Sequence, residues 1–301
     1  MLSIIIVNYK TSRDISICLE SIVENERNYS NYEFIIVDNN SDDSGLKNIS
    51  ENYNFVNIIY APKNGGFAYG NNIGIKASSG DCILLLNPDT YIIENNSIEK
   101  LYNHLKQNHD INFIGPQLLY PDKSNQSYYH PKSNLTLWRL FCERLFLHRM
   151  LSNSKLFNSY FMTYMDYKKP KYVEQINGAA FMFKRDVIDK IGLLDENYFM
   201  YFEESDYCLQ AIKNGYRLLY YPYSRIIHKG GLIAESNWVR STRDYIISFK
   251  YYFKKNYNNS VYFIAMLLFF IGTMIRIITL WLKGNKKYSY YLFYLKYLFK
   301  T

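Results

Sequence analysis

The sequence has few cysteines, and none is spaced for zinc binding. Its 301 residues contain four cysteines (Cys18, Cys82, Cys142 and Cys208), which are scattered and form no Cys-x-x-Cys pair. Such cysteines are typical of small buried side chains in a reducing compartment. The N-terminus lacks the basic segment and cleavage site of a secretory signal, and Ser3–Val7 resembles a buried strand instead. We therefore expect the globular part to stay in the cytoplasm.

The chain also lacks the glycine-rich motifs GxGxxG and GxxxxGK[ST]. Their absence disfavours a dinucleotide site and an ATP-hydrolysing site. There is no long internal repeat and no Gly/Ser linker. Hydrophobic residues make up 48% of the chain and charged residues 21%, which indicates a globular protein rather than a disordered one. The length suffices for one large domain or two modest ones.

Negative charge is scarce in the last part of the chain. Residues 237–301 contain eleven Lys or Arg and one acid, a net charge of +10, whereas the whole chain carries +8 and the preceding part therefore −2. A near-neutral body with a basic, aromatic tail favours an anionic membrane surface as partner and not nucleic acid. RNA binding is the alternative, because basic residues alternate with aromatic ones in RNA-binding proteins too.

The first 110 residues alternate between apolar strands and helices. Four short apolar runs, at residues 4–7, 34–37, 56–60 and 83–86, predict strands, and Thr11 with Asp14 predicts a capping box before a helical stripe. Strands joined by helices indicate a mainly parallel sheet covered on both faces. The segment from about 120 to 172 has short helical runs between prolines, which suits a lid, an acceptor-binding insert or an ordinary surface insertion.

Polar residues follow three of the predicted strands: Asn8, then Asp38-Asn39-Asn40, then Asn87-Pro88-Asp89. In open α/β sheets, ligands bind beyond the carboxyl ends of the strands. Asp38 is suited to accept hydrogen bonds from a nucleobase or a ribose, and Asp89 is suited to bind a divalent cation together with phosphate oxygens. Polar residues of these types also occur at ordinary strand-to-loop transitions. Three such strand ends together are therefore stronger evidence for a ligand site than any one of them.

Two glycines precede a predicted helix in PKNGGFAYGNNIGI, residues 62–75. Gly65 and Gly66 allow the backbone to approach a ligand closely, and the helix behind them would present its N-terminus to a phosphate. The alternative interpretation is a simple turn.

Carboxylates cluster at Glu203, Glu204 and Asp206, just before a helical stripe. Acids at a helix start can simply complement the helix dipole. Clustered carboxylates also raise one another's pKa, which suits a general base near neutral pH. His228 follows the next predicted strand, and it is either a structural residue or a contact to a metal or diphosphate.

Residues 261–282 are almost all apolar and would reach about 33 Å as a helix, enough to cross a bilayer. A single crossing would place Lys283, Lys286 and Lys287 outside, against the positive-inside rule, and would leave Arg276 to snorkel. We therefore favour a helix at the membrane interface. A true span and a helix buried within the protein are the alternatives.

The order of these motifs resembles the family 2 glycosyltransferases with the GT-A fold, especially their rhamnosyltransferase-like branch. The resemblance covers about residues 1–235 and is carried by SIIIVNYK, VDNNSDD, NGGFAYGNN, LLLNPDT, NGAAFMFKR, LLDENYFMYFEESDYC and HKGG. It implies a mixed, mainly parallel sheet flanked by helices, followed by membrane-associated helices. The expected parts are a donor-binding half at 1–110, an acceptor and catalytic half at 111–236, and a membrane-associated region at 237–301.

The resemblance also implies roles for individual residues. The donor would lie along Val7, Asn8, Asp38, Asn40, Asn64, Gly65, Gly66, Asn71, Asn87 and Asp89, and Gly178, Ala179 and Asp195 would lie on the acceptor side. Mg²⁺ or Mn²⁺ would be held by Asp89 and His228. The base would be Glu204, where the family usually has an Asp, so Glu203 and Asp206 remain alternatives. Asn87 stands where the family's metal motif often has its first acid, which leaves the metal with fewer charged ligands.

The implied activity is inverting, metal-dependent transfer of a sugar from a nucleotide diphosphate donor, dTDP-rhamnose or a UDP-sugar. The acceptor would be a lipid-linked or polysaccharide glycan at the cytoplasmic face of the cell membrane, in the synthesis of cell-surface glycans. Two other functions are weighed against it. A degenerate scaffold is favoured only by Asn87 and Glu204. A sugar nucleotidyltransferase usually has a glycine-rich segment after its first strand, which Val7–Lys10 lacks.

Overall fold

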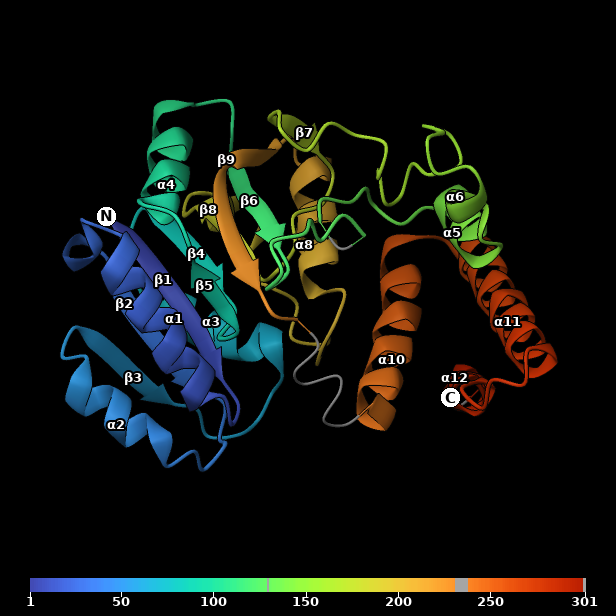
Figure 1. Ribbon diagram of the computed structural model, residues 1–301, viewed down its shortest axis with the longest axis horizontal. Coiled ribbons are helices and arrows are strands. Elements are labelled where there is room, and N and C mark those ends of the chain that lie inside the picture. Colours follow the sequence, from blue (N-terminus) through green and yellow to red (C-terminus); the bar gives the residue numbers. More distant parts are fainter. Residues whose placement is uncertain (129, 231–237, 300–301) are drawn as a thin grey trace. The chain divides into compact units, whose positions relative to one another are not determined.

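The computed structural model describes residues 1–128, 130–230 and 238–299 and divides into two compact units (Figure 1). The first unit comprises Met1–Lys132, Asp166–Phe199 and Glu203–Gly230; the second comprises Ser133–Met165, Met200–Phe202 and Gly231–Thr301. The expected boundary at 110/111 lies inside the first unit, and the one at 236/237 touches residues outside the described ranges. The division into donor and acceptor halves stays a prediction.

The first unit is an α/β structure. Its strands are β1 (Leu2–Asn8), β2 (Glu33–Asp38), β3 (Val56–Tyr60), β4 (Cys82–Leu86), β5 (Thr90–Ile92), β6 (Phe113–Leu119), β7 (Lys171–Val173), β8 (Ala180–Lys184) and β9 (Leu218–His228). Its helices are α1 (Ser12–Asn25), α2 (Gly45–Asn52), α3 (Phe67–Ala77), α4 (Ser97–Gln107), α7 (Val187–Ile191) and α8 (Glu203–Lys213), with a 3₁₀ turn at Tyr29–Asn31.

All these strands form one mixed sheet, in the order β3-β2-β1-β4-β8-β6-β9-β5, with β7 also paired to β9. Strands β3, β2, β1 and β4 are parallel, whereas β8 runs antiparallel to both β4 and β6. Strand β9 is parallel to β6 and antiparallel to β5 and β7. The predicted mixed sheet flanked by helices is confirmed.

Alternate residues of each central strand face different helices. Ile4 and Ile6 of β1 belong to the core cluster that includes Cys18 and Leu19 of α1 and the apolar residues of α2 and α4. Ile5 points to the opposite face, where an added Cβ on Gly74 of α3 would lie 2.4 Å from its Cγ2. Strands buried on both faces need no polar alternation, which explains their continuous apolar sequence.

The four strands expected from apolar runs are all present, and the helix after the first strand begins at Ser12 as expected. The predicted capping box is wrong, because the Thr11 side chain makes no capping hydrogen bond. Its hydroxyl donates instead to Oδ1 of Asn8, at 2.9 Å. Thr11 thereby orients a residue at the end of β1 and does not cap α1.

The second unit is helical. It contains α5 (Leu137–Arg144), α6 (Leu147–Met150), α10 (Trp238–Asn256), α11 (Asn259–Leu282) and α12 (Tyr288–Leu298). Phe249 of α10 and Phe269 of α11 pack with ring centroids 4.7 Å apart, and both are fully buried. The predicted helices of the basic tail therefore form, and they share a core with the short helices expected between residues 120 and 172.

Candidate active site

Hydrogen bonds join the carboxyl ends of β1 and β2. The side-chain amide of Asn8 donates to Oδ1 of Asp38 at 2.8 Å and to the Ser41 hydroxyl at 3.1 Å. Ser41 in turn donates its hydroxyl to Oδ1 of Asp38 and its backbone N–H to Oδ2, the latter at 3.1 Å. Asp38 is only 4% exposed. Its carboxylate is therefore fixed in place, and its predicted contact to a nucleobase stays a prediction.

The second of the paired glycines, Gly66, lies beside the backbone of a distant segment. Gly66 has a positive φ of 90°, and a Cβ on it would lie 2.1 Å from the carbonyl oxygen of Phe199. The same oxygen accepts the backbone N–H of Phe67, the first residue of α3, at 2.9 Å. Gly66 is thus required by close backbone packing, and one of the amides at the start of α3 already has a protein partner.

Asn64 and Asn71, which are predicted to contact the sugar donor, make hydrogen bonds in and beside this loop. Asn39 donates to Oδ1 of Asn64 at 3.1 Å and to the Gly66 carbonyl at 2.9 Å. Asn71 is buried and donates to the Phe67 carbonyl, at 2.9 Å. The contacts of Asn64 and Asn71 to the sugar donor stay predictions.

Three further residues were predicted to contact the sugar donor or the acceptor: Val7, Asn40 and Asp195. Val7 faces α3, where a Cβ on Gly70 would contact its methyl group, and Asn40 is exposed with a positive φ of 55°. Asp195 accepts the backbone and side-chain N–H groups of Asn197, at 3.0 and 2.7 Å. Their roles toward donor and acceptor also stay predictions.

Asp89 and His228 are brought together by the pairing of β5 with β9, in which Thr90 lies opposite His228. Nε2 of His228 lies 3.4 Å from Oδ1 of Asp89, and the backbone N–H of Gly230 donates to Oδ2 of Asp89 at 3.0 Å. Burial by itself would raise the pKa of Asp89, but the hydrogen bond and charge of His228 and the Gly230 N–H together hold it below its usual range. Asp89 is therefore an ionised, nearly buried carboxylate.

Gln126 fixes the orientation of His228. Its amide nitrogen donates to the backbone carbonyl of His228, and its Oε1 lies 3.2 Å from Nδ1 of the same residue. An amide oxygen only accepts, so this arrangement assigns the ring proton to Nδ1. Nε2 then faces Asp89: it donates to the carboxylate while the ring is protonated, and its lone pair becomes available there once that proton is lost, as in histidines that bind metals. Sequence reasoning missed Gln126, because an isolated glutamine in a turn gives no local signal.

The oxygen and nitrogen atoms around Asp89 suit a divalent cation that also binds substrate. Nδ2 of Asn87 lies 3.5 Å from Nε2 of His228, while its Oδ1 is buried without a hydrogen-bond partner. No group of three His, Cys, Asp or Glu side chains able to hold a metal occurs within the described residues. One carboxylate and one imidazole leave several coordination positions for phosphate oxygens. The residues present therefore fit a cation shared with a diphosphate.

The loop before β8 contacts both Asn87 of this cluster and Glu204 of α8. The Ala179 carbonyl accepts the backbone N–H of Asn87 at 2.9 Å, and Oδ1 of Asn177 accepts the Ala179 N–H at 2.8 Å. The neighbouring Gly178 lies against Glu204, whose Cβ and Cγ would each be 3.7 Å from an added Cβ. The cluster formed by Asn87, Asp89 and His228 and the acid Glu204 thus both adjoin this three-residue loop.

A buried histidine holds that loop, and sequence reasoning missed it. Nδ1 of His130 accepts the Asn177 N–H at 3.2 Å, and its Nε2 lies 2.7 Å from the Pro116 carbonyl. Burial lowers the pKa of His130 to about 3, so the ring is neutral and donates from Nε2. His130 is a fixed support and not an acid or base.

The three predicted carboxylates occupy the first turn of α8. Glu203 and Asp206 are 5% and 2% exposed, whereas Glu204 is more accessible. Burial, and next the charge of Glu204, raise the pKa of Glu203 well above its usual range. Burial also raises the pKa of Glu204, while backbone hydrogen bonds and the charge of Lys132 oppose the shift. Glu204 is therefore the member of the cluster best placed to exchange a proton with a ligand.

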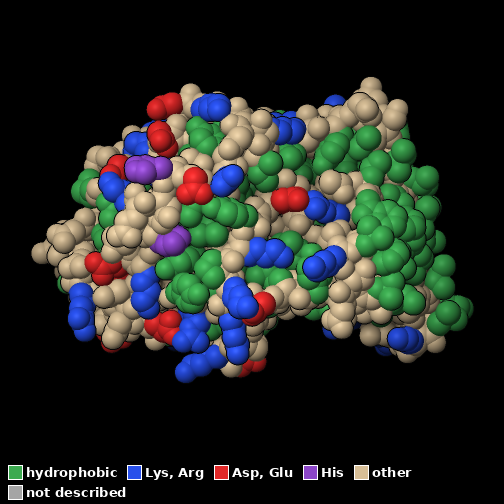
Figure 2. All heavy atoms as spheres, turned by 90° about the horizontal axis from the view of Figure 1, so that it is seen from above, with side chains coloured by type: hydrophobic (Ala, Val, Ile, Leu, Met, Phe, Trp, Pro, Cys, Tyr) green, Lys and Arg blue, Asp and Glu red, His purple; other side chains and the backbone are tan. Residues whose placement is uncertain are grey.

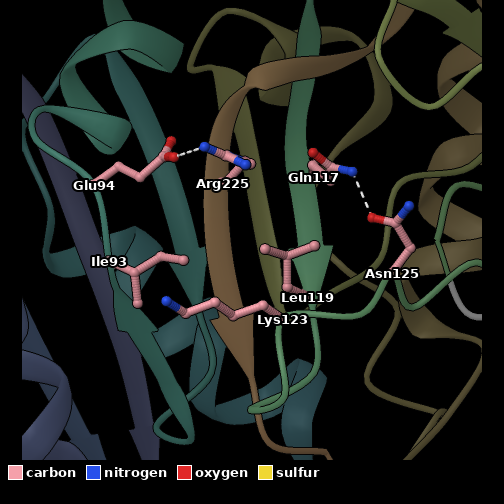
Figure 3. Close-up of a pocket in the computed structure, with 7 residues that line it drawn as sticks. All are labelled: Ile93, Glu94, Gln117, Leu119, Lys123, Asn125 and Arg225. Carbon is pink, nitrogen blue, oxygen red and sulfur yellow. Dashed lines mark hydrogen bonds and ion pairs between the residues drawn. The ribbon is translucent and has the colours of Figure 1, made fainter.

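A pocket of about 310 Å³ lies elsewhere in the first unit and contains none of the predicted site residues (Figure 3). It is lined by Ile93, Glu94, Gln117, Leu119, Lys123, Asn125 and Arg225. Two pairs of its polar side chains bond to each other, Arg225 with Glu94 and Gln117 with Asn125. This pocket is therefore not the predicted active site at Asp89 and Glu204.

Solved structures with the same architecture are nucleotide-sugar transferases. A mannosyltransferase from Pyrobaculum calidifontis, solved with GDP-Man and Mn²⁺, matches 99% of this chain and 84% of its own with a TM-score of 0.56 at 13% identity. Residues 1–349 of TarS from S. aureus, solved with UDP-GlcNAc, match 90% of this chain and 71% of their own, with a TM-score of 0.52 at 14% identity. At this identity the likeness defines the fold, which is GT-A.

The family is shown by sequence. The model of glycosyl transferase family 2 matches residues 3–192, and the chain belongs to that family. The low-salt glycan biosynthesis hexosyltransferase Agl10 of Haloferax volcanii is 31% identical over 216 residues, which cover 70% of this chain and 61% of that protein. The glycosyltransferase GlyG of Streptococcus pneumoniae is 27% identical over 43% of each chain. The chain thus matches less than two thirds of the length of either relative.

Proposed function

We propose that this protein is an inverting, metal-dependent glycosyltransferase. The observation that carries the proposal is that the Asn177–Ala179 loop contacts Asn87, which lies beside the pair of Asp89 and His228, and also contacts Glu204. A transferase needs these two functions close together, one for the leaving diphosphate and one for the attacking hydroxyl.

The donor is a nucleotide diphosphate sugar that binds beyond the carboxyl ends of β1, β2 and β4. Asp38, already oriented by Asn8 and Ser41, accepts hydrogen bonds from the base or ribose. Asn40, Asn64 and Gly65 lie along the donor. The mannosyltransferase of the same fold, solved with GDP-Man and Mn²⁺, supports a donor of this class.

Asp89 and His228 would hold Mg²⁺ or Mn²⁺, next to the side chain of Asn87. The cation, when bound, stabilises the negative charge that develops on the leaving diphosphate. Gln126 keeps the proton of His228 on Nδ1, which leaves Nε2 free to bind. The Gly230 N–H holds the second carboxylate oxygen of Asp89.

Glu204 acts as the general base. It takes the proton from an acceptor hydroxyl while the hydroxyl oxygen bonds to the anomeric carbon. The bond from that carbon to the diphosphate oxygen breaks in the same step, so the nucleoside diphosphate leaves and the anomeric centre inverts. A raised pKa makes a carboxylate a stronger base near neutral pH, and Glu204 is more accessible than Glu203 or Asp206. Gly178, Ala179 and Asp195 line the acceptor side.

The acceptor is a lipid-linked or polysaccharide glycan, and the enzyme works in cell-surface glycan synthesis. The relatives include a hexosyltransferase of low-salt glycan biosynthesis and a poly(ribitol-phosphate) beta-glucosyltransferase from Bacillus spizizenii, which support this class of product. dTDP-rhamnose and UDP-sugars are the first donors to test. We place the enzyme at the cytoplasmic face of the cell membrane, attached through its C-terminal region.

The test is to incubate purified protein with UDP-, dTDP- and GDP-sugars, Mn²⁺ and membrane acceptors, with and without chelator. We expect release of a nucleoside diphosphate that chelator abolishes. Formation of diphosphate from a nucleoside triphosphate would instead identify a nucleotidyltransferase. If the folded protein releases no nucleoside diphosphate with any donor, the result would support the alternative function of a degenerate scaffold.

A further inference from the structure

Helix α11 exposes one continuous apolar face. Its exposed side chains include Phe263, Ile264, Leu267, Ile271, Ile278 and Trp281, which are between 37% and 69% exposed. At 100° per residue these six lie within about 100° of one another around the helix axis. The helix is long and apolar enough to cross a membrane, and only 22% of its most apolar window is buried within the protein. Such a surface is larger than a water-exposed helix normally carries.

The opposite face of α11 packs within the second unit. Ala265, Phe269, Gly272 and Thr273 are all buried, and Gly272 allows close contact with α5. A Cβ on Gly272 would lie 2.7 Å from Cβ of Arg144. The helix thus has a protein-facing side and an uncovered side along its whole length.

Ion pairs hold the protein-facing side of α11 against α5. Arg276, in the sequence a candidate for snorkelling, pairs with Glu143 of α5 at 2.8 Å, and both side chains are mostly buried. Glu143 also pairs with Arg144 at 2.7 Å, and the Arg144 guanidinium lies 4.0 Å from the centre of the Phe269 ring. If α11 crossed a bilayer, α5 and these three charges would enter the hydrocarbon with it, at high energetic cost. The contacts therefore oppose a transmembrane orientation.

Positive charge follows the apolar face. Lys283, Lys286 and Lys287 are exposed directly after α11, next to the exposed Trp281. Aromatic and cationic residues at the end of an apolar face are suited to the boundary between acyl chains and anionic headgroups. Figure 2 shows hydrophobic side chains gathered over the part of the second unit where α11 lies in Figure 1.

We propose that α11 lies in the plane of an anionic bilayer, with its uncovered face in the acyl-chain boundary and its Arg276 face on the protein. Both ends of the helix then remain on the same side of the membrane. This inference rests on the proposed membrane location and not on the transferase chemistry.

The first test is flotation of the full-length protein with phosphatidylcholine vesicles, with and without phosphatidylglycerol. We expect binding that phosphatidylglycerol strengthens and that Leu267→Glu weakens by about tenfold or more. Tyr60→Glu is the matched control, because Tyr60 is 68% exposed but lies on β3 of the first unit. Equal binding of Leu267→Glu and wild type would overturn the proposal, as would a wild-type dimer that Leu267→Glu dissociates without any vesicle binding.

The second test distinguishes an in-plane helix from a spanning one. A reporter fused after Thr301 and one fused before Met1 should report the same side of the membrane in cells. Opposite sides would overturn the in-plane orientation while leaving the membrane location intact. Loss of transferase activity with a soluble donor and acceptor would concern the proposed chemistry alone, so the failures of the two proposals are distinguishable.

Discussion

Nε2 of His228 lies 3.4 Å from Oδ1 of Asp89, although 138 residues separate the two along the chain. The backbone N–H of Gly230 and the amide of Gln126 hold the pair from either side. In the proposed enzyme these two side chains bind the cation. Asp89→Asn removes its negative ligand, so we expect turnover to fall by about 10² or more and calorimetric binding of Mn²⁺ with donor to weaken.

Asp110→Asn is the control for that change, since Asp110 is an exposed aspartate that pairs with Arg217. It should leave turnover and Mn²⁺ binding as in wild type. Undiminished Mn²⁺ binding by Asp89→Asn would remove this residue from the cation site.

Gln126 should act on metal affinity through His228. Gln126→Ala frees the ring to rotate and to change tautomer, so we expect the concentration of Mn²⁺ for half-maximal activity to rise by about 10- to 100-fold. Activity at saturating Mn²⁺ should change much less. Gln117→Ala is the matched control, because Gln117 bonds to Asn125 and does not contact His228. An Mn²⁺ titration curve unchanged by Gln126→Ala would contradict the orienting role.

The buried carboxyl group of Glu203 should make the protein less stable as the pH rises. Its carboxyl group is buried, its Oε2 has no hydrogen-bond partner, and burial raises its pKa well above 4.5. The folded state then holds a proton that the unfolded state releases, so the free energy of unfolding falls as pH rises above about 4.5 toward the raised pKa. Each unit of raised pKa corresponds to about 1.4 kcal/mol.

Glu203→Gln removes this titration. We expect the variant to gain stability relative to wild type between pH 5 and pH 8, measured by urea unfolding. The same difference in unfolding free energy at both pH values would contradict the assignment.

Gly66 should tolerate no side chain, because of its contact to Phe199. Gly66→Ala places a Cβ 2.1 Å from the Phe199 carbonyl, and we expect a loss of about 3 kcal/mol or more in unfolding free energy. Gly192→Ala is the matched control: its φ is 77° but a Cβ there meets nothing within 4 Å. It should lose about 1–2 kcal/mol from backbone strain alone. Equal losses in thermal or urea unfolding would show that the Phe199 contact is unimportant.

The sequence predicted the first half of the sheet well, because β1, β2 and β4 are continuous apolar runs with a polar residue at or directly after the end, namely Asn8, Asp38 and Asn87. It did not predict how His228 reaches Asp89, since that depends on the pairing of β9 with β5, a strand of three residues with no pattern of its own. The supports Gln126 and His130 were missed because both lie in a segment that resembled a loop. Arg276 was interpreted as a charge that would have to snorkel out of a bilayer. Its partner Glu143 lies 133 residues away, so the ion pair could not be recognised from the sequence.

The general base is tested most directly by comparing Glu204→Gln with Glu203→Gln. Glutamine keeps the size of either side chain but cannot take a proton, so the two variants differ only in which carboxylate is lost. Single-turnover release of nucleoside diphosphate and donor affinity by thermal shift would be measured for both. We predict that Glu204→Gln binds donor like wild type and turns over about 10² or more times slower, while Glu203→Gln loses much less activity. Wild-type turnover by Glu204→Gln would contradict the proposed mechanism.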